Sequence, residues 1–167
     1  MELINARLID IDKIMVIIND AQVFLRAQGI DQWQDGYPAR NNIIDDITKR
    51  KAYVLRVDNN IVAYGAIIVG QDPTYLKIDG SWLNDDPYMV IHRIAVDSNQ
   101  RGRGLALMFI KEAIVLAKNK GIRNIRLDTH RDNLIMQRLL DKLGFTYCGI
   151  IYLNSGAKRM AYQKILD

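Results

Sequence analysis

A strand, a glycine-containing turn and an amphipathic helix follow one another without a break between residues 91 and 120. The strand is apolar up to Val96, the turn contains Arg101–Gly104, and the helix begins at Leu105. Glycine adopts positive φ angles easily and lets a ligand approach the backbone amides closely. The first N–H groups of a helix are unpaired and its dipole favours an anion, so this segment predicts a phosphate or pyrophosphate site.

Neither of the two common nucleotide-binding motifs fits this turn. No Gly-Lys-Ser/Thr sequence follows it, as a P-loop requires, and its glycine spacing differs from that of the dinucleotide-binding fingerprint. Arg101 and Arg103 add two cations beside the amides. On these residues alone, a tight strand-to-helix turn without a ligand remains an alternative.

Hydrophobic periodicity predicts a mixed order of helices and strands along the chain. An Asp-Asn-Asn sequence at residues 58–60 predicts a hairpin turn, Asp10 or Asp12 is expected to cap the first helix, and Asn133 the last. The order of elements predicts an α/β (or α+β) fold with one largely antiparallel central sheet of about six or seven strands, flanked by about four helices. Helices are expected near residues 10–28, 42–50, 105–120 and 133–143, and strands near 2–9, 52–57, 61–69, 88–96, 122–128, 145–153 and 158–165.

Length and cysteine content indicate what kind of chain this is. A length of 167 residues suits one globular domain, expected over residues 1–167, and excludes two large ones. The single Cys148 cannot form an intramolecular disulfide, which favours a reducing cytoplasm. The N-terminus is acidic where a signal peptide is basic, and the longest uncharged apolar stretch, residues 61–70, is about half the length of a membrane span. We therefore expect a cytoplasmic protein without membrane contact.

Charge is unevenly distributed between the two parts of the chain. Residues 1–91 contain 9 basic and 13 acidic residues, whereas residues 92–167 contain 14 basic and 6 acidic residues. The basic part could bind nucleic acid or a small polyanion such as a nucleotide phosphate. Its bases are scattered singly, so solvated helix faces are an equally simple interpretation.

The turn resembles the acetyl-CoA-binding motif of the GNAT superfamily of N-acetyltransferases, Arg/Gln-x-x-Gly-x-Gly/Ala after a strand that ends apolar-x-Val. The matching residues are Arg101–Ala106, which follow Ile94–Val96. Two further family features occur downstream, where Asn133 opens a helix that ends in Lys142–Phe145. The strict resemblance covers about residues 90–147, and the order of elements resembles the family over nearly the whole chain.

The resemblance implies a GNAT fold, acetyl-CoA as co-substrate and no metal. It places acceptor-side elements at about residues 1–90 and the acetyl-CoA-binding core at about 90–147. It implies that Ile94 and Val96 pair with the pantetheine arm, that a bulge in their strand polarises the thioester carbonyl through a backbone N–H, and that Asn133 contacts the pantetheine or its phosphate side. The amides expected to hold the pyrophosphate are those of Gly102, Arg103, Gly104, Leu105 and Ala106.

Acetyl transfer to an amine needs a base, and His92 is the candidate. It lies in the strand that enters the motif, where several family members carry a catalytic glutamate, and imidazoles titrate near neutral pH. The alternative is a core or supporting histidine. His130, the other histidine, is expected to orient a group or to hold the loop before Asn133.

The general acid is not evident. The family often carries a tyrosine at the position that Leu140 occupies here. Tyr88, Tyr147, Tyr152 or water could protonate the leaving thiolate. Cys148 suggests a covalent intermediate, but its apolar surroundings in sequence favour a buried, inert thiol.

The acceptor site is expected in the irregular segments 29–38 and 71–87. Both are rich in aromatic and acidic residues, which suit a cationic amine. The candidates are Trp33, Tyr37 and Trp82, with Asp85 and Asp86. The alternative is that both tryptophans cover a sheet edge.

Together these features predict a single-domain N-acetyltransferase that moves the acetyl group of acetyl-CoA to a primary amine of a small molecule or peptide. A homodimer is possible. The alternative is a non-catalytic acyl-CoA-binding sensor or partner module, suggested by the missing tyrosine. A nucleic-acid binder ranks last, because no stacking aromatic residues alternate with the bases.

Overall fold

The computed structural model describes all residues from Met1 to Asp167. The chain packs as two compact units, one made of Met1–Ile67 with His92–Ala113 and the other of Ile68–Ile91 with Ile114–Asp167. The helices are α1 (Ile11–Ala27), α2 (Arg40–Thr48), α3 (Leu105–Asn119) and α4 (Leu134–Lys142). The strands are β1 (Glu2–Asn5), β2 (Ala52–Val57), β3 (Asn60–Val69), β4 (Asp79–Gly80), β5 (Tyr88–Val96), β6 (Asn124–Thr129), β7 (Thr146–Tyr152) and β8 (Lys158–Ile165).

The strands form one mixed sheet, which confirms the predicted fold class. Their order is β1-β2-β3-β5 in the first unit and β5-β6-β8-β7-β4 in the second, and β5 has residues in both. β5 and β6 are parallel, whereas β1–β2, β2–β3, β4–β7, β6–β8 and β7–β8 are antiparallel. The sheet has eight strands, so the expected number of six or seven was slightly too low.

The additional strand is β4, within a segment that was expected to be a loop. Two residues are too few for an alternating pattern, so the sequence shows no strand signal there. β4 pairs with β7 through Gly80 and Gly149, whose backbones come very close together. A Cβ atom on Gly80 would lie 2.2 Å from the carbonyl oxygen of Cys148. The strand therefore depends on two glycines that are distant in sequence.

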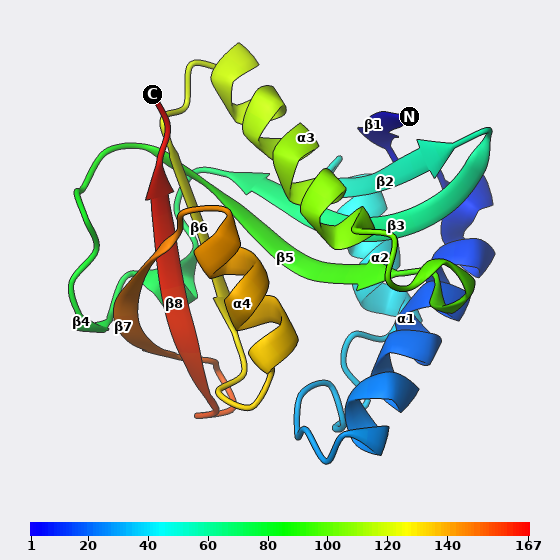
Figure 1. The fold of residues 1–167 in the computed structure, drawn as a ribbon, viewed down its shortest axis with the longest axis horizontal. Helices are drawn as coiled ribbons and strands as arrows, with labels where there is room; N and C mark the ends of the chain where they lie inside the picture. Colours follow the sequence, from blue (N-terminus) through cyan, green and yellow to red (C-terminus); the bar gives the residue numbers. More distant parts are fainter. The chain divides into compact units, whose positions relative to one another are not determined.

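In the first unit, helices cover both faces of β3. Tyr64 joins a core made with residues of α1, α2 and β2, whereas the neighbouring Gly65 faces Phe109 of α3, because adjacent residues of a strand point to opposite faces. Figure 1 shows the first turns of α3 in front of β3 and α2 behind it. The buried members of the core are Ala6, Ile11, Ile14, Ile17, Ile18, Ile43, Ala52, Val54, Ile61, Tyr64 and Ala95.

Gly65→Ala is expected to destabilise the protein by about 2 kcal/mol through overpacking. The new methyl group would lie 2.5 Å from the Cζ atom of Phe109, whose fully buried side chain would have to shift. Chemical denaturation measures the free energy of unfolding. The double variant Gly65→Ala/Phe109→Leu should recover part of the loss; additive effects of the two changes would contradict this explanation.

In the second unit, the segment between β3 and β5 packs on the sheet. Tyr75 is almost fully buried, and it forms an apolar cluster with Tyr88, Val90 of β5 and Ile151 of β7. Trp82 is partly buried against the same cluster. The expected long polar loop is therefore partly a structural cover for one face of this unit.

Most predicted boundaries lie within two residues of the observed ones. Asp58 and Asn59 adopt φ angles of 47° and 63°, which confirms the hairpin turn. The first strand ends at Asn5 rather than Ile9, because Leu8–Asp10 form a 3-10 helix. None of the helices has the length and apolar character needed to cross a membrane.

The two expected helix caps have different outcomes. The side chain of Asn133 accepts a hydrogen bond from the N–H of Met136 at 3.2 Å, which confirms this cap. Asp10 is the N-cap residue of α1, which confirms the predicted position, but its side chain makes no capping hydrogen bond. Its carboxylate accepts from the backbone N–H of Arg7 and from Arg56 of β2 instead.

Candidate active site

The turn between β5 and α3 has the geometry of an anion site. Gly102 and Gly104 adopt φ angles of 80° and 72°, and the space beside each is open. The first hydrogen bond of α3 runs from the N–H of Met108 to the carbonyl of Gly104 at 3.0 Å. The helical N–H groups that precede Met108 therefore point out of the helix end, where a phosphate group can accept from them.

Helix α1 holds the turn from the side. The carboxylate of Asp97 accepts hydrogen bonds from the ammonium group of Lys13 and from the backbone N–H of Asn99 at 3.0 Å. The Arg101 guanidinium lies 4.1 Å from the centroid of the Phe24 ring and donates to a backbone carbonyl of α1 at 3.1 Å. Both arginines are exposed, but the Arg101 side chain lies against α1. These contacts attach the turn to α1.

The Asp97 contact predicts a pH dependence of stability. Partial burial alone would raise the pKa of Asp97, but the hydrogen bonds from Lys13 and Asn99 outweigh it and hold the pKa below its ordinary value. A carboxylate whose pKa is lowered in the folded state stabilises the protein fully when the pH is above the pKa of the same group in the unfolded chain, about 3.9. The stabilisation is lost as the pH falls from there through the pKa of the folded state.

We therefore expect Asp97→Asn to lower the free energy of unfolding by a constant amount above about pH 5. The difference from the wild type should shrink as pH falls below about 4. Urea titrations at several pH values measure it. A difference that stays the same down to about pH 2.5 would contradict the assignment to this ion pair.

A cavity of about 510 Å³ adjoins the turn in the first unit. It is lined by Arg103, by the Lys13–Asp97 pair and by Leu105 and Met108 of α3. Residues at the end of the β2–β3 hairpin complete it. A cation and apolar surface thus lie together beside the glycine turn.

Strand β5 has an irregular backbone at Arg93. Its φ angle is 59°, a left-handed conformation that is rare for a residue with a Cβ and strained inside a strand. The expected alternation of His92, Ile94 and Val96 is therefore interrupted, and all three are partly buried. The departure lies in the strand segment where a bulge was expected.

A partly buried ion pair accompanies this irregularity. The Arg93 side chain donates to both carboxylate oxygens of Asp46 at 2.8 and 2.7 Å, and its Nε donates to the hydroxyl of Tyr37 at 2.6 Å. Tyr64 donates its hydroxyl to the same carboxylate at 2.7 Å. Burial, followed by the nearby Asp46, raises the pKa of Tyr64. Burial alone would lower the pKa of Arg93, but Tyr37 and Asp46 raise it, so the guanidinium stays charged.

Asp46, Tyr64 and Arg93 were not among the functional residues predicted from the sequence. Asp46 is 47 positions from Arg93, and its local sequence is that of an ordinary polar helix. No spacing or motif signals the pair. Tyr37, which was identified from composition, is partly exposed and is fixed by this cluster.

Of the remaining acceptor candidates, the two tryptophans make packing contacts within the fold. Trp33 packs against the apolar core of the first unit. The Trp82 indole donates to the carbonyl of Tyr75 at 3.0 Å, and its ring lies 4.2 Å from the Arg126 guanidinium. Asp85 and Asp86 are exposed. These contacts favour the alternative in which both tryptophans cover the sheet.

Asp128, near the end of β6, accepts a hydrogen bond from a tyrosine, and a histidine follows in the next loop. Tyr75 donates its hydroxyl to Asp128 at 2.7 Å. In the following loop, the Nδ1 atom of His130 accepts from the backbone N–H of Asp132 at 3.1 Å, and its carbonyl accepts from the N–H of Asn133. His130 thus holds the loop before α4, as one of the expected alternatives stated.

The candidate general acids and the cysteine differ in their surroundings. Leu140 is fully buried, so its position provides core packing. Tyr88 is buried, whereas Tyr147 and Tyr152 are exposed. Cys148 is buried, as predicted, and burial raises the pKa of its thiol, which disfavours the nucleophilic thiolate.

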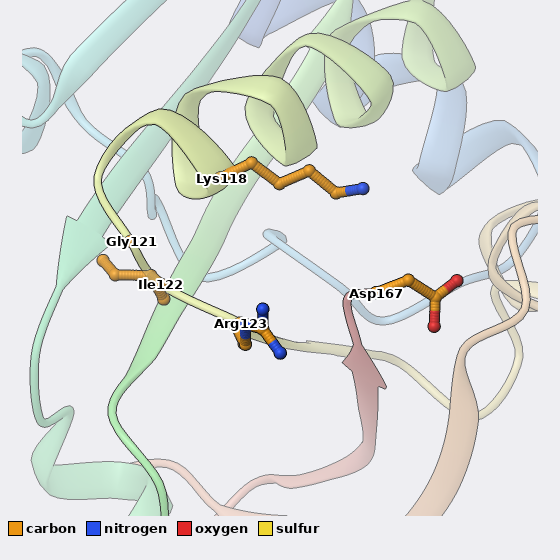
Figure 2. A pocket seen from close by; sticks show the side chains of 5 residues that line it. All are labelled: Lys118, Gly121, Ile122, Arg123 and Asp167. Atoms are coloured by element: carbon orange, nitrogen blue, oxygen red, sulfur yellow. The ribbon is translucent and has the colours of Figure 1, made fainter.

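A second cavity, of about 220 Å³, lies at the C-terminal end of α3. Figure 2 shows Lys118, Arg123 and Asp167 around it, with Gly121 and Ile122 at the chain turn. The C-terminal end of a helix presents carbonyl oxygens rather than amides, so this cavity lacks the anion-binding geometry of the glycine turn. The structure contains no group of three or more His, Cys, Asp or Glu side chains that could hold a metal ion.

A family model for the acetyltransferase (GNAT) family matches residues 18–145. The chain belongs to the GNAT family. The match includes the glycine turn, both histidines and Asn133. Residues Arg101–Ala106 therefore lie within a GNAT domain, as their resemblance predicted.

Two solved structures have the same fold. A GNAT acetyltransferase from Streptococcus agalactiae is 41% identical, with a TM-score of 0.90 over 99% of this chain and 95% of its own. An acetyltransferase from Salmonella typhimurium, solved with acetyl-CoA, is 19% identical, with a TM-score of 0.69 over 100% of this chain and 94% of its own. The second likeness concerns the fold alone.

A curated relative is streptothricin acetyltransferase from Escherichia coli. It is 32% identical over 93 residues, which are 56% of this chain and 52% of the relative. The match thus spans about half the length of that protein. GNAT proteins use acetyl-CoA, and the turn at the start of α3 has open space beside Gly102 and Gly104.

Proposed function

We propose that this GNAT protein transfers the acetyl group of acetyl-CoA to a primary amine of a small molecule or peptide. The amine nitrogen attacks the thioester carbon, the carbon–sulfur bond breaks, and CoA leaves as a thiolate. The amine loses one proton, and the thiolate takes one up. The observation that carries the proposal is the open glycine turn at the start of α3, in a chain of this family.

The turn is the proposed pyrophosphate site. Its positive φ angles and open surroundings leave room for phosphate oxygens beside the helix amides. Ile94 and Val96 are proposed to pair with the pantetheine arm, and Asn133, which caps α4, to contact the cofactor. The proposed pyrophosphate ligands are the amides of Gly102, Arg103, Gly104, Leu105 and Ala106, with Arg101 supporting the turn from α1.

His92 is the proposed base. It lies in β5 next to the irregular Arg93, and it is only partly buried, so a substrate proton can reach it. Direct attack is favoured over a covalent route, because burial raises the pKa of the Cys148 thiol. With a buried leucine at position 140, water or a tyrosine such as Tyr147 protonates the leaving thiolate.

The acceptor is proposed to be a cationic amine near Tyr37. Tyr37 is the acceptor candidate with an exposed ring and a fixed hydroxyl, whereas Trp33 and Trp82 are proposed to shape the site from packed positions. The name of the curated relative makes streptothricin the first compound to test. We further propose a single acetyltransferase domain over residues 1–167 that acts in the cytoplasm, in agreement with the single cysteine.

A thermal-shift titration with acetyl-CoA, CoA and ATP, followed by thiol release with an amine panel, tests the proposal. Stabilisation by both CoA species together with thiol release for one class of amine is the expected result. Streptothricin, polyamines, amino acids, aminoglycosides and peptides with free N-termini make up the panel. A failure of both CoA species to stabilise the protein would contradict the proposed cofactor site.

A second candidate is an acyl-CoA sensor without turnover. The buried Leu140, in place of the family tyrosine, favours it. It predicts stabilisation by acetyl-CoA with no amine-dependent thiol release. The same experiment therefore separates the two functions.

A further inference from the structure

One buried carboxylate connects the irregular strand to the proposed acceptor loop. Asp46 of α2 is 3% exposed, and both of its oxygens accept from Arg93. A buried carboxylate is strongly disfavoured without a partner, so the pair holds the Arg93 side chain at α2. The hydroxyl of Tyr64 satisfies the same carboxylate from β3.

The backbone of Arg93 needs such support. Its φ angle of 59° is unfavourable for any residue with a Cβ, and Arg93 has apolar or β-forming neighbours that otherwise favour an extended strand. No glycine is present at this position to relieve the strain. A strained backbone persists where surrounding contacts hold it, and the Nη1 atom of Arg93 donates to both carboxylate oxygens of Asp46.

The same guanidinium also fixes the acceptor loop. Its Nε donates to the Tyr37 hydroxyl at 2.6 Å, and its Cζ lies 5.2 Å from the centroid of the Tyr37 ring. The side chain of Gln22 donates to the carbonyl of Tyr37 at 3.1 Å. Arg93 thus joins the strand that carries His92 to the loop that carries Tyr37.

We infer that Asp46 is a positioning residue: acting through the Arg93 side chain, it holds the backbone of Arg93 in its left-handed conformation beside His92 and fixes Tyr37 for the acceptor. Asp46 is 3% exposed and its carboxylate is occupied by Arg93 and Tyr64, so we assign it no direct role toward substrate. It therefore affects the reaction through the geometry of β5 and of the loop that carries Tyr37. The inference rests on the proposed acetyltransferase function.

Asp46→Asn tests the inference, because it keeps the shape and removes the charge. We expect kcat to fall at least about 30-fold, while the KM for acetyl-CoA changes less than about threefold, because small misplacements of reacting groups are costly. Tyr64→Phe is the matched control. It removes the other hydrogen bond to the same carboxylate but keeps the Arg93 pair, so kcat should stay within about threefold of the wild type. Equal losses of kcat in both variants would indicate general destabilisation and overturn the inference.

A glycine comparison tests the role of the backbone. Glycine adopts positive φ freely, whereas alanine does not. In the Asp46→Asn background, Arg93→Gly should therefore give a kcat about tenfold higher than Arg93→Ala. Equal kcat values in the two double variants would show that the φ angle of residue 93 is unimportant.

Two further measurements cover the remaining outcomes. NMR scalar couplings and ¹³Cα shifts report the φ angle of residue 93 without any turnover. Residue 93 should become extended in Asp46→Asn. A residue 93 that stays left-handed in this variant would overturn the inference. A wild type that releases no thiol with any amine would refute the proposed function, and the NMR result would still decide the role of Asp46. If Asp46→Asn does not fold, Arg93→Lys is the substitute variant. Lysine keeps the charge but cannot reach Asp46 and Tyr37 together. A kcat of Arg93→Lys within about threefold of the wild type would contradict the inference.

Discussion

Gly104→Asp should weaken acetyl-CoA binding by about 100-fold, which corresponds to about 2.7 kcal/mol. Gly104 has a φ angle of 72° and open space beside it, just before the first helical N–H groups of α3. A carboxylate there would stand against the proposed pyrophosphate. Two unit charges about 4 Å apart repel by about 4 kcal/mol at an effective dielectric constant of 20, and solvent at this exposed turn reduces the effect. Isothermal titration calorimetry measures the Kd.

Gly121→Asp is the matched control for this substitution. Gly121 follows the other end of the same helix, has a φ angle of 70°, and also has open space beside it. Both variants therefore impose a similar backbone cost, but only one places the charge at the amide end of α3. Equal affinities of the two variants for acetyl-CoA would show that the pyrophosphate binds elsewhere.

His92→Ala should lower kcat by about 100-fold or more while the Kd for acetyl-CoA changes less than about threefold. The physical reason is that removing a base affects proton transfer from the attacking amine but not the earlier binding step. Steady-state kinetics measures kcat, and isothermal titration calorimetry measures the Kd.

His130→Ala is the control for the histidine substitution. Its imidazole accepts a backbone N–H in the loop before α4, so its loss should cost less than about tenfold in kcat. A wild-type kcat in His92→Ala would exclude His92 as the base. A larger loss in His130→Ala than in His92→Ala would transfer the base role to His130.

The features that were predicted correctly depend on residues close together in sequence. The hairpin turn at Asp58 and Asn59, the cap at Asn133 and the open turn at Gly102 and Gly104 each follow from the conformations that these residue types adopt. Periodicity likewise located the four helices and seven of the eight strands. The boundary errors occur where short 3-10 turns or tertiary contacts compete with the local pattern.

The features that were missed depend on pairs of distant residues. β4 forms because two glycine backbones meet at Gly80 and Gly149, 69 positions apart in the sequence. The expected packing role of Trp82 was one of two alternatives until its contacts with Tyr75 and Arg126 were known. An alternation rule for β5 also failed at Arg93, because a side-chain contact controls its backbone.

The sequence by itself determined the GNAT family, the order of most elements and the glycine turn proposed to bind pyrophosphate, because periodicity, capping and positive φ are properties of short segments. Only the tertiary structure decided that Asp46 meets Arg93, that Arg93 is left-handed, and that Arg101 lies on α1 rather than over the turn. Such contacts depend on strand register and helix packing, which bring together residues that are distant in sequence. The local sequence around one of these residues does not predict which residue it will contact.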